Sequence, residues 1–232
     1  MAAPPYLIVW DLDRTLGVFE ALERVRDTAV RVEIELRPGM GRALERLADA
    51  GFAHTVLSLA TPDYAELALR GAGLRSHFLE VACQGHRFKG DAAGIAQSHG
   101  IPEAERGARM LFVGDHVLYD APQDARVLLH LEPRALRRPA DRLVELVLGL
   151  RERGHGSLRA GFDELLGAGA APDEIAPRDL HGAGRLLLLP RERACPVVAF
   201  EDDEQADTAS AERVSFVPAE AYPELAEKLG QA

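Results

Sequence analysis

Short apolar runs and helical patterns alternate along the first part of the chain. Four runs each end at a polar residue and lead into a helical pattern; they span 6–10, 53–57, 110–113 and 127–131. A weaker run spans 78–82. Runs of this length with helical segments between them are typical of buried parallel strands joined by crossover helices. The pattern therefore predicts an α/β fold with a doubly wound, Rossmann-like parallel sheet.

The segment between the first two runs predicts a helix. Pro38 is suited to a first helical position, Leu44 and Leu47 mark an apolar face, and Gly51 is suited to the end. In open sheets of this kind, ligands bind beyond the carboxyl ends of the strands, where the strand order reverses. The residues just after each run are therefore the first candidates for a functional site.

The pattern changes after Pro133, where irregular stretches separate the predicted elements. We expect helices over 136–154 and 162–166, strands over 184–189 and 196–200, and a solvated acidic loop over 201–212. The chain accordingly divides into a predicted α/β core, 1–133, and a C-terminal α+β extension of unknown role, 134–232.

Composition is that of an ordinary globular enzyme. Of 232 residues, 47% are hydrophobic and 28% charged, and no apolar run approaches the roughly 20 residues that span a bilayer. The N-terminus has no basic residue before its apolar run, which favours a strand over a signal peptide. Cys83 and Cys195 are too few for a disulfide framework or a clustered metal site. We expect a soluble, cytoplasmic protein with no membrane partner.

The charge balance limits the choice of partners. A net charge of −10 argues against general nucleic-acid binding, because phosphate backbones are bound by clustered lysine and arginine. A site that acts on nucleic-acid ends stays open. Lys89 and Lys228 are the only lysines in the chain, so a lysine at 89 stands out, although chance could place it there.

Two acids follow the first run. Asp11 and Asp13 are two residues apart, and in an extended chain such residues project to the same side. Two carboxylates at one place need a cation or a shared proton. A pair with this spacing also occurs as a helix cap or a turn, but its position directly after a buried strand favours a site.

Candidate phosphate-binding residues follow the second run. Ser58 ends it, and its hydroxyl could donate to a phosphoryl oxygen; the alternative is a solvated loop serine. Thr61 precedes Pro62 and is better suited to cap a helix. Lys89 lies just before a helical pattern, where it could hold a phosphoryl oxygen and balance the carboxylates, or be an ordinary surface lysine.

A second acidic segment follows the run at 110–113. Asp115 and Asp120 are five apart on a predicted loop, and such acids can share one hard cation. Mg²⁺ prefers octahedral oxygen ligands and usually retains several waters. The expected protein ligands are Asp11, the backbone carbonyl of Asp13, and Asp115, with Asp120 acting directly or through water.

The order of these elements is more specific than any one of them. With DLDRTL at 11–16 and VGDHVLYD at 113–120, the chain resembles the haloacid dehalogenase superfamily of phosphohydrolases over about residues 6–131. The resemblance implies a Mg²⁺-dependent phosphomonoester hydrolase that acts through an aspartyl phosphate. It also implies residue roles: nucleophile Asp11, general acid and base Asp13, phosphoryl-holding residues Ser58 and Lys89, metal ligand Asp115 and its support Asp120.

The spacing of the motifs bears on the substrate. About 40 residues separate Asp13 from the second run and about 30 separate Ser58 from Lys89, which leaves no room for a full inserted cap domain. Residues 16–36 are similar to the short helical turn and β-hairpin flap of the family, with a strand over 30–36. The chain thus resembles the capless, magnesium-dependent phosphatases.

Several alternatives stay open. An uncovered site would suit a phosphoprotein or a nucleic-acid end, whereas a site covered by 134–232 or by a second subunit would suit a small metabolite. The same scaffold could carry a phosphotransferase. A catalytically quiet module would instead bind a phosphorylated ligand and contact a partner, or a second copy of the chain, through 134–232.

Overall fold

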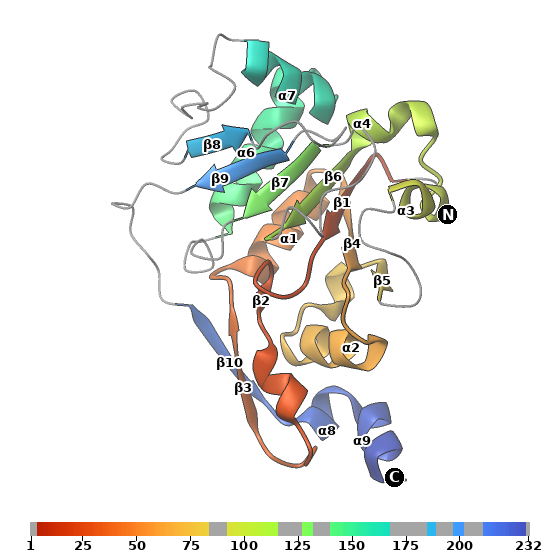
Figure 1. Ribbon diagram of the computed structural model, residues 1–232, viewed down its shortest axis with the longest axis vertical. Helices are drawn as coiled ribbons and strands as arrows, with labels where there is room; N and C mark the ends of the chain where they lie inside the picture. Colours follow the sequence, from red (N-terminus) through yellow and green to blue (C-terminus); the bar gives the residue numbers. More distant parts are fainter. Residues whose placement is uncertain are drawn as a thin grey trace.

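The computed structural model describes residues 4–83, 92–115, 127–131, 140–167, 185–188, 197–201 and 211–230. Within these residues the main sheet has seven strands in the order β5-β4-β1-β6-β7-β9-β8 (Figure 1). Neighbouring strands are parallel, apart from β8, which is antiparallel to β9. The predicted α/β class with a parallel sheet is confirmed. The strands are β1 (Tyr6–Trp10), β4 (Phe52–Leu57), β5 (Glu80–Ala82), β6 (Met110–Gly114), β7 (Val127–Leu131), β8 (Arg185–Leu188) and β9 (Val197–Glu201).

Strand β1 is third in this order, and we call it the central strand because the strand order reverses there. It pairs with β4 on one side and β6 on the other, so that Trp10 is in register with Val56 and with Val113. Its last four residues are buried, as expected for a strand covered on both faces. The strand order reverses at β1, which makes its carboxyl end the place where a ligand site is expected.

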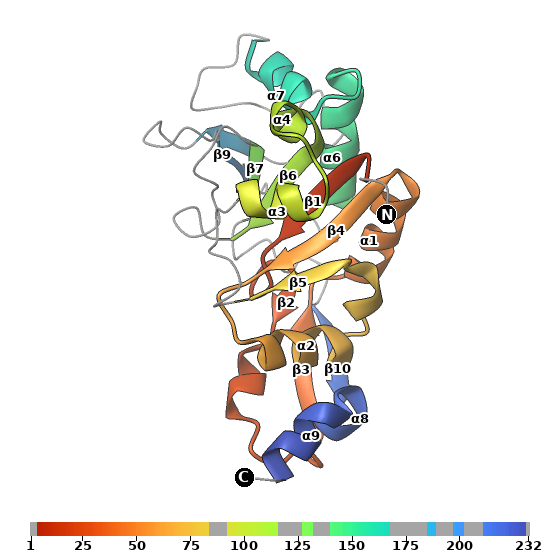
Figure 2. The same cartoon turned by 90° about the vertical axis from the view of Figure 1, so that its right-hand side faces the viewer.

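Helices cover both faces of the sheet (Figures 1 and 2). On one face, Ile8 and Trp10 belong to a large apolar cluster with α1 (Met40–Asp49) and α6 (Asp141–Arg153). On the other, Leu7 and Val9 pack with Ile95 of α3 (Ala92–Ser98). The alternation along β1 follows from the period of two in a strand. The remaining helices are α2 (Pro62–Gly71), α4 (Arg106–Arg109), α7 (Leu158–Gly167) and the 3₁₀ turns η2 (Arg75–His77) and η3 (Glu103–Glu105).

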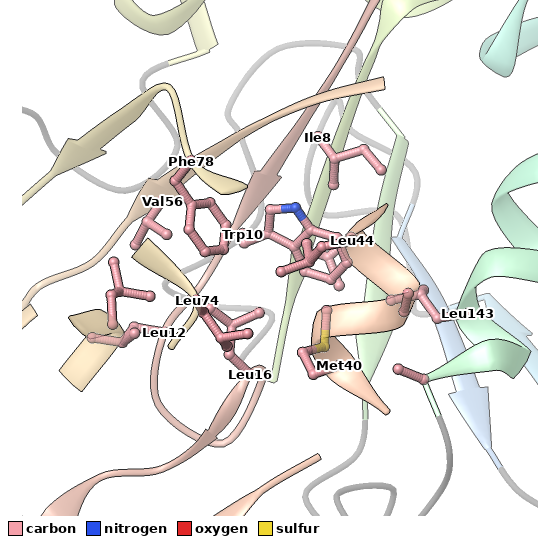
Figure 3. Close-up of a cluster of buried hydrophobic side chains, with 14 of the residues drawn as sticks. Ile8, Trp10, Leu12, Leu16, Met40, Leu44, Val56, Leu74, Phe78 and Leu143 are labelled. Atoms are coloured by element: carbon pink, nitrogen blue, oxygen red, sulfur yellow. The ribbon is translucent and has the colours of Figure 1, made fainter. Parts of the chain in front are cut away.

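Trp10 is the largest side chain at the centre of the core, and Figure 3 shows it among Leu44 and Phe78. Its indole N–H donates to Nδ1 of His54 at 3.2 Å, and Nε2 of His54 lies 3.0 Å from the carbonyl oxygen of Leu44. Because Nδ1 accepts, the proton of the neutral ring is on Nε2 and is donated to Leu44. Burial lowers the pKa of His54 to about 4.

The chain between β1 and α1 forms a flap. It contains β2 (Gly17–Val18), the 3₁₀ turn η1 (Glu20–Arg24) and β3 (Val32–Leu36), and β2 is antiparallel to β3. The predicted helical turn and hairpin are therefore present. In the described stretches between β1 and β4 and between β4 and β5, there is no inserted cap domain, as predicted.

Helix α1 begins two residues later than predicted. Gly39 precedes it with a φ of 72°, in the left-handed region, so helical geometry starts at Met40 and not at Pro38. Glycine adopts this conformation without the steric cost that other residues have. The predicted end is correct, because Ala50 caps the helix and Gly51 follows with a φ of 89°.

The C-terminal residues return to the flap. Strand β10 (Glu212–Phe216) is antiparallel to β3 and completes a small sheet in the order β10-β3-β2. Glu212 therefore starts a strand and does not belong to an acidic loop, in contrast to the prediction. After β10, α8 (Pro218–Ala221) and α9 (Pro223–Gly230) lie beside α2, at the end of the molecule opposite α7 (Figure 1).

The other predicted elements of the C-terminal part are present with shifted ends. Helix α6 lies within 136–154, and α7 begins at Leu158, four residues before the predicted start at Phe162. Strands β8 and β9 lie at the two predicted places and extend the main sheet beyond β7. No helix in the described parts of the chain is long and apolar enough to cross a membrane.

Candidate active site

The loop after β1 turns back on itself within a few residues. The amide of Asp11 donates to the carbonyl of Val113 at 2.8 Å, which continues the ladder between β1 and β6 by one step. Arg14 has a φ of 61°, an uncommon conformation for a residue with a side chain. Its amide donates to the carbonyl of Gly17 at 2.6 Å. The carboxylates of Asp11 and Asp13 therefore lie at the carboxyl end of the central strand.

Asp11 is held by a neighbouring hydroxyl. Asp11 is 6% exposed, and Thr15 Oγ1 donates to Asp11 Oδ2 at 3.2 Å. Thr15 is itself fixed, since its carbonyl accepts from Nε of the buried Arg37 at 2.9 Å. Sequence reasoning did not identify Thr15 or Arg37; a hydroxyl four residues after the acid was the only available signal.

Asp13 is held by a phenol from another element. The hydroxyl of Tyr64 donates to Asp13 Oδ1 at 2.7 Å. Tyr64 lies in the first turn of α2, where its amide donates to Oγ1 of Thr61 at 3.4 Å, so the predicted cap at Thr61 is confirmed. Burial, and then the negative charge of Asp13, raise the pKa of Tyr64. The phenol therefore keeps its proton and acts as a donor.

Ser58 lies at the same edge of the sheet. It is 2% exposed, and its amide donates to the carbonyl of Ala82 at 2.9 Å, which continues the pairing of β4 with β5. Its Oγ accepts from the amide of Ala60 at 3.1 Å, so the hydroxyl hydrogen is not used in that bond. Because Trp10 is in register with Val56, Ser58 leaves β4 one residue beyond the level at which Asp11 leaves the neighbouring β1.

Asp115 follows β6 directly and is half-buried. The charge of Asp115 affects the pKa of Arg14. The guanidinium of Arg14 donates to Glu20 Oε1 at 3.0 Å. The pKa of Arg14 is raised, first by Glu20 and then by the charges of Asp115 and Asp13. Asp13 and Asp115 thus both act electrostatically on the guanidinium of Arg14.

Two predicted site residues, Lys89 and Asp120, lie outside the described residues. Within the described part of the chain, no group of three or more histidine, cysteine or acidic side chains could hold a metal ion. The expected set for Mg²⁺ differs from such a group, because it combines the side chains of Asp11 and Asp115 with a backbone carbonyl of Asp13. All of these donors are oxygens, at the ends of adjacent strands, which suits an ion that keeps several waters.

No protein-family model matches the sequence, and no curated protein matches it. Similar solved structures include a HAD-superfamily hydrolase from Ehrlichia chaffeensis (10% identity, TM-score 0.40), which covers 58% of this chain and 90% of that one. They also include L-2-haloacid dehalogenase from Xanthobacter autotrophicus (15% identity, TM-score 0.39), with 74% and 100% covered. A predicted phosphoglycolate phosphatase from Haemophilus somnus has 18% identity and a TM-score of 0.33, with 42% and 45% covered.

These identities and TM-scores are low, so the roles of individual residues rest on the geometry of this chain alone. The neighbours named above include hydrolases with different substrates. The similarity to these chains lies in the arrangement of strands and helices.

Proposed function

We propose that the chain is a Mg²⁺-dependent phosphomonoester hydrolase in which Asp11 is transiently phosphorylated. One observation carries the proposal. Two carboxylates leave the carboxyl end of the central strand, and each is held by its own hydroxyl donor: Asp11 by Thr15, and Asp13 by Tyr64. Two acids held separately at the edge where ligands bind can perform two different tasks, attack and proton transfer.

The first half of the reaction transfers the phosphoryl group. An oxygen of the Asp11 carboxylate attacks phosphorus, and the bond from phosphorus to the ester oxygen breaks. Protonated Asp13 gives its proton to that leaving oxygen, so an alcohol departs and Asp11 carries the phosphoryl group. Ser58 supports this step because its hydroxyl can donate to a phosphoryl oxygen.

The second half restores the enzyme. Asp13, now a carboxylate, accepts a proton from a water molecule that attacks phosphorus. Inorganic phosphate leaves, Asp11 becomes a carboxylate again, and Asp13 is protonated for the next cycle. The same side chain thus serves as acid and then as base.

The charges at the site require compensation, because a phosphate dianion must approach two acids. Asp11, Asp115 and the carbonyl of Asp13, together with Asp120, would hold Mg²⁺, which when bound offsets the negative charge of the phosphoryl group. Lys89 is proposed to hold a phosphoryl oxygen in the same way as Ser58.

The direct test measures phosphate release. We expect the purified chain to hydrolyse p-nitrophenyl phosphate only when Mg²⁺ is present, and Asp11→Asn to abolish the reaction. Asp163→Asn is the matched control, because Asp163 lies on α7 and pairs with Arg159 on the surface. A folded protein that releases no phosphate from a broad panel of phosphoesters would contradict the proposal.

The intermediate has its own test. Beryllofluoride mimics a phosphoryl group on a carboxylate, and we expect a crystal structure to show it on Asp11. Finding it on Ser58 would contradict the assignment of the nucleophile. The panel should include a phosphopeptide, an oligonucleotide with a phosphorylated end and small phosphorylated metabolites, since each remains a candidate substrate.

A further inference from the structure

We propose that Tyr64 is a positioning residue for Asp13, and that it holds the carboxyl group where it can pass a proton to the leaving oxygen. The inference rests on the proposed function and adds a residue outside the acidic motifs. It begins from the 2.7 Å hydrogen bond between the Tyr64 hydroxyl and Asp13 Oδ1, which joins α2 to the loop after β1.

The phenol is well suited to hold a carboxyl group in place. The Tyr64 ring is half-buried and packs against the large apolar cluster, so the hydroxyl has little freedom to move. The contact pairs a phenol hydroxyl with a carboxylate oxygen, so the hydroxyl is the donor and Asp13 the acceptor. A donor on a packed side chain of a helix orients its acceptor more firmly than a solvent molecule would.

The first turn of α2 is fixed from two sides. Thr61 caps it at the N-terminus, and Asp63 accepts hydrogen bonds from Tyr222 at 3.0 Å and from Lys228 at 2.6 Å. Tyr222 lies between α8 and α9 and Lys228 lies in α9, and these two C-terminal helices lie beside α2 (Figure 2). Tyr64 therefore projects toward Asp13 from a turn that the C-terminal helices hold in place.

If Tyr64 positions Asp13, the loss of rate on removing the Tyr64 hydroxyl should depend on the leaving group of the substrate. An alkyl phosphate releases a strongly basic alkoxide, which needs a proton from Asp13, whereas p-nitrophenyl phosphate releases a phenolate that is stable without one. A misplaced Asp13 should therefore slow alkyl esters selectively. The quantity to compare is kcat/KM, because it reports the steps through release of the first product.

The central variant is Tyr64→Phe, measured on p-nitrophenyl phosphate and on the best alkyl phosphate of the panel. We expect kcat/KM for the alkyl ester to fall on the order of tenfold to a hundredfold, the effect of one hydrogen bond to a charged group. For p-nitrophenyl phosphate we expect a change of less than about threefold. Circular dichroism and thermal melting establish that the variant is folded.

Tyr222→Phe is the matched control. It also removes a phenol hydroxyl that donates to a carboxylate on α2, but that carboxylate is Asp63, which keeps Lys228 as a partner. The ratio of the two kcat/KM values should stay at the wild-type value. A change in that ratio as large as that of Tyr64→Phe would show a general effect on α2 and overturn the inference.

A double-mutant cycle tests whether Tyr64 acts through Asp13. In an Asp13→Asn background, adding Tyr64→Phe should cause no further loss on the alkyl ester, because the group that it positions is gone. A further loss of about tenfold, or an equal loss on both esters in the single variant, would overturn the positioning role. Absence of activity in the wild type on both esters would instead contradict the proposed function, and the inference with it.

Discussion

The indole N–H of Trp10 donates to Nδ1 of His54 at 3.2 Å, inside the core beside the central strand. The bond requires a neutral imidazole, since a protonated ring carries hydrogen on both nitrogens and has no acceptor. Nε2 donates to the carbonyl of Leu44, so both nitrogens are used. A neutral His54 thus connects β4 to β1 and to α1, and protonation would remove the acceptor for Trp10 while leaving the bond to Leu44.

Acidification should therefore destabilise the protein through His54. Its pKa is about 4 in the folded protein and about 6.5 in an unfolded chain, so the unfolded chain takes up the proton first as the pH falls. The contribution of a neutral His54 is full above pH 6.5 and is lost progressively toward pH 4. Between pH 7 and pH 5 the loss amounts to about 2 kcal/mol in the free energy of unfolding.

This loss is measured by urea unfolding of the wild type and of His54→Gln, each at pH 7 and at pH 5. Glutamine can accept from Trp10 and donate to Leu44 but does not titrate. Subtracting the free energy of unfolding of one protein from that of the other cancels the contributions of the other acids and histidines, because these titrate in both proteins. A difference in free energy that is the same at pH 7 and pH 5 would show that His54 carries no such penalty.

The metal requirement should depend on Asp115. Asparagine in its place keeps one oxygen but removes a negative charge, so we expect Asp115→Asn to raise the Mg²⁺ concentration for half-maximal activity about tenfold or more. A magnesium titration of phosphate release measures it. Glu103→Gln is the control, because Glu103 is an exposed acid in η3. An unchanged requirement in Asp115→Asn would remove this residue from the ligand set.

The stability of the flap should depend on the absence of a side chain at Gly17. A Cβ there would lie 2.5 Å from the backbone oxygen of Glu35 and 2.9 Å from Leu36 Cδ2. Strands β2 and β3 would have to separate, and we expect Gly17→Ala to lower the free energy of unfolding by about 1–3 kcal/mol. Activity should fall as well, because Gly17 pairs with the loop that carries Asp13.

Gly41→Ala is the matched substitution for this test. Its Cβ would meet Leu74 Cδ2 at an ordinary 3.7 Å, within helix α1. Alanine favours a helix, so this variant should be as stable as wild type or more stable, by up to about 1 kcal/mol. Thermal or urea unfolding compares the two variants. Equal stabilities would contradict the close packing of β2 on β3.

The core of the fold could be predicted because strands such as β1 and β6 are almost entirely buried and so have continuous apolar runs. β1 and β7 have the bounds that their apolar runs predict, and the acids at 11, 13 and 115 follow strands as expected. The start of α1 could not be placed, since the sequence alone does not show that Gly39 adopts a left-handed φ. Lys89 and Asp120 stay predictions, because they lie outside the described residues.

Contacts between distant segments were not predictable from local pattern. β10 is only partly buried, so its apolar periodicity is weak. It forms a strand because it pairs with β3. The sequence likewise places Tyr64 in a helix without showing which side chain its hydroxyl meets. The donors that hold the two site acids, Thr15 and Tyr64, therefore required the three-dimensional structure.

The pairing of β3 with β10 has a consequence for how the protein folds. Val32 lies opposite Phe216, so the small sheet β10-β3-β2 joins segments that are far apart in the sequence. Contacts between such distant segments form late, because a long loop must close before they are made. During synthesis the central sheet and the acidic loop can assemble first, while the flap lacks its third strand until residues 212–216 have emerged. We expect this small sheet to be the last part to fold and the first to open in the native protein.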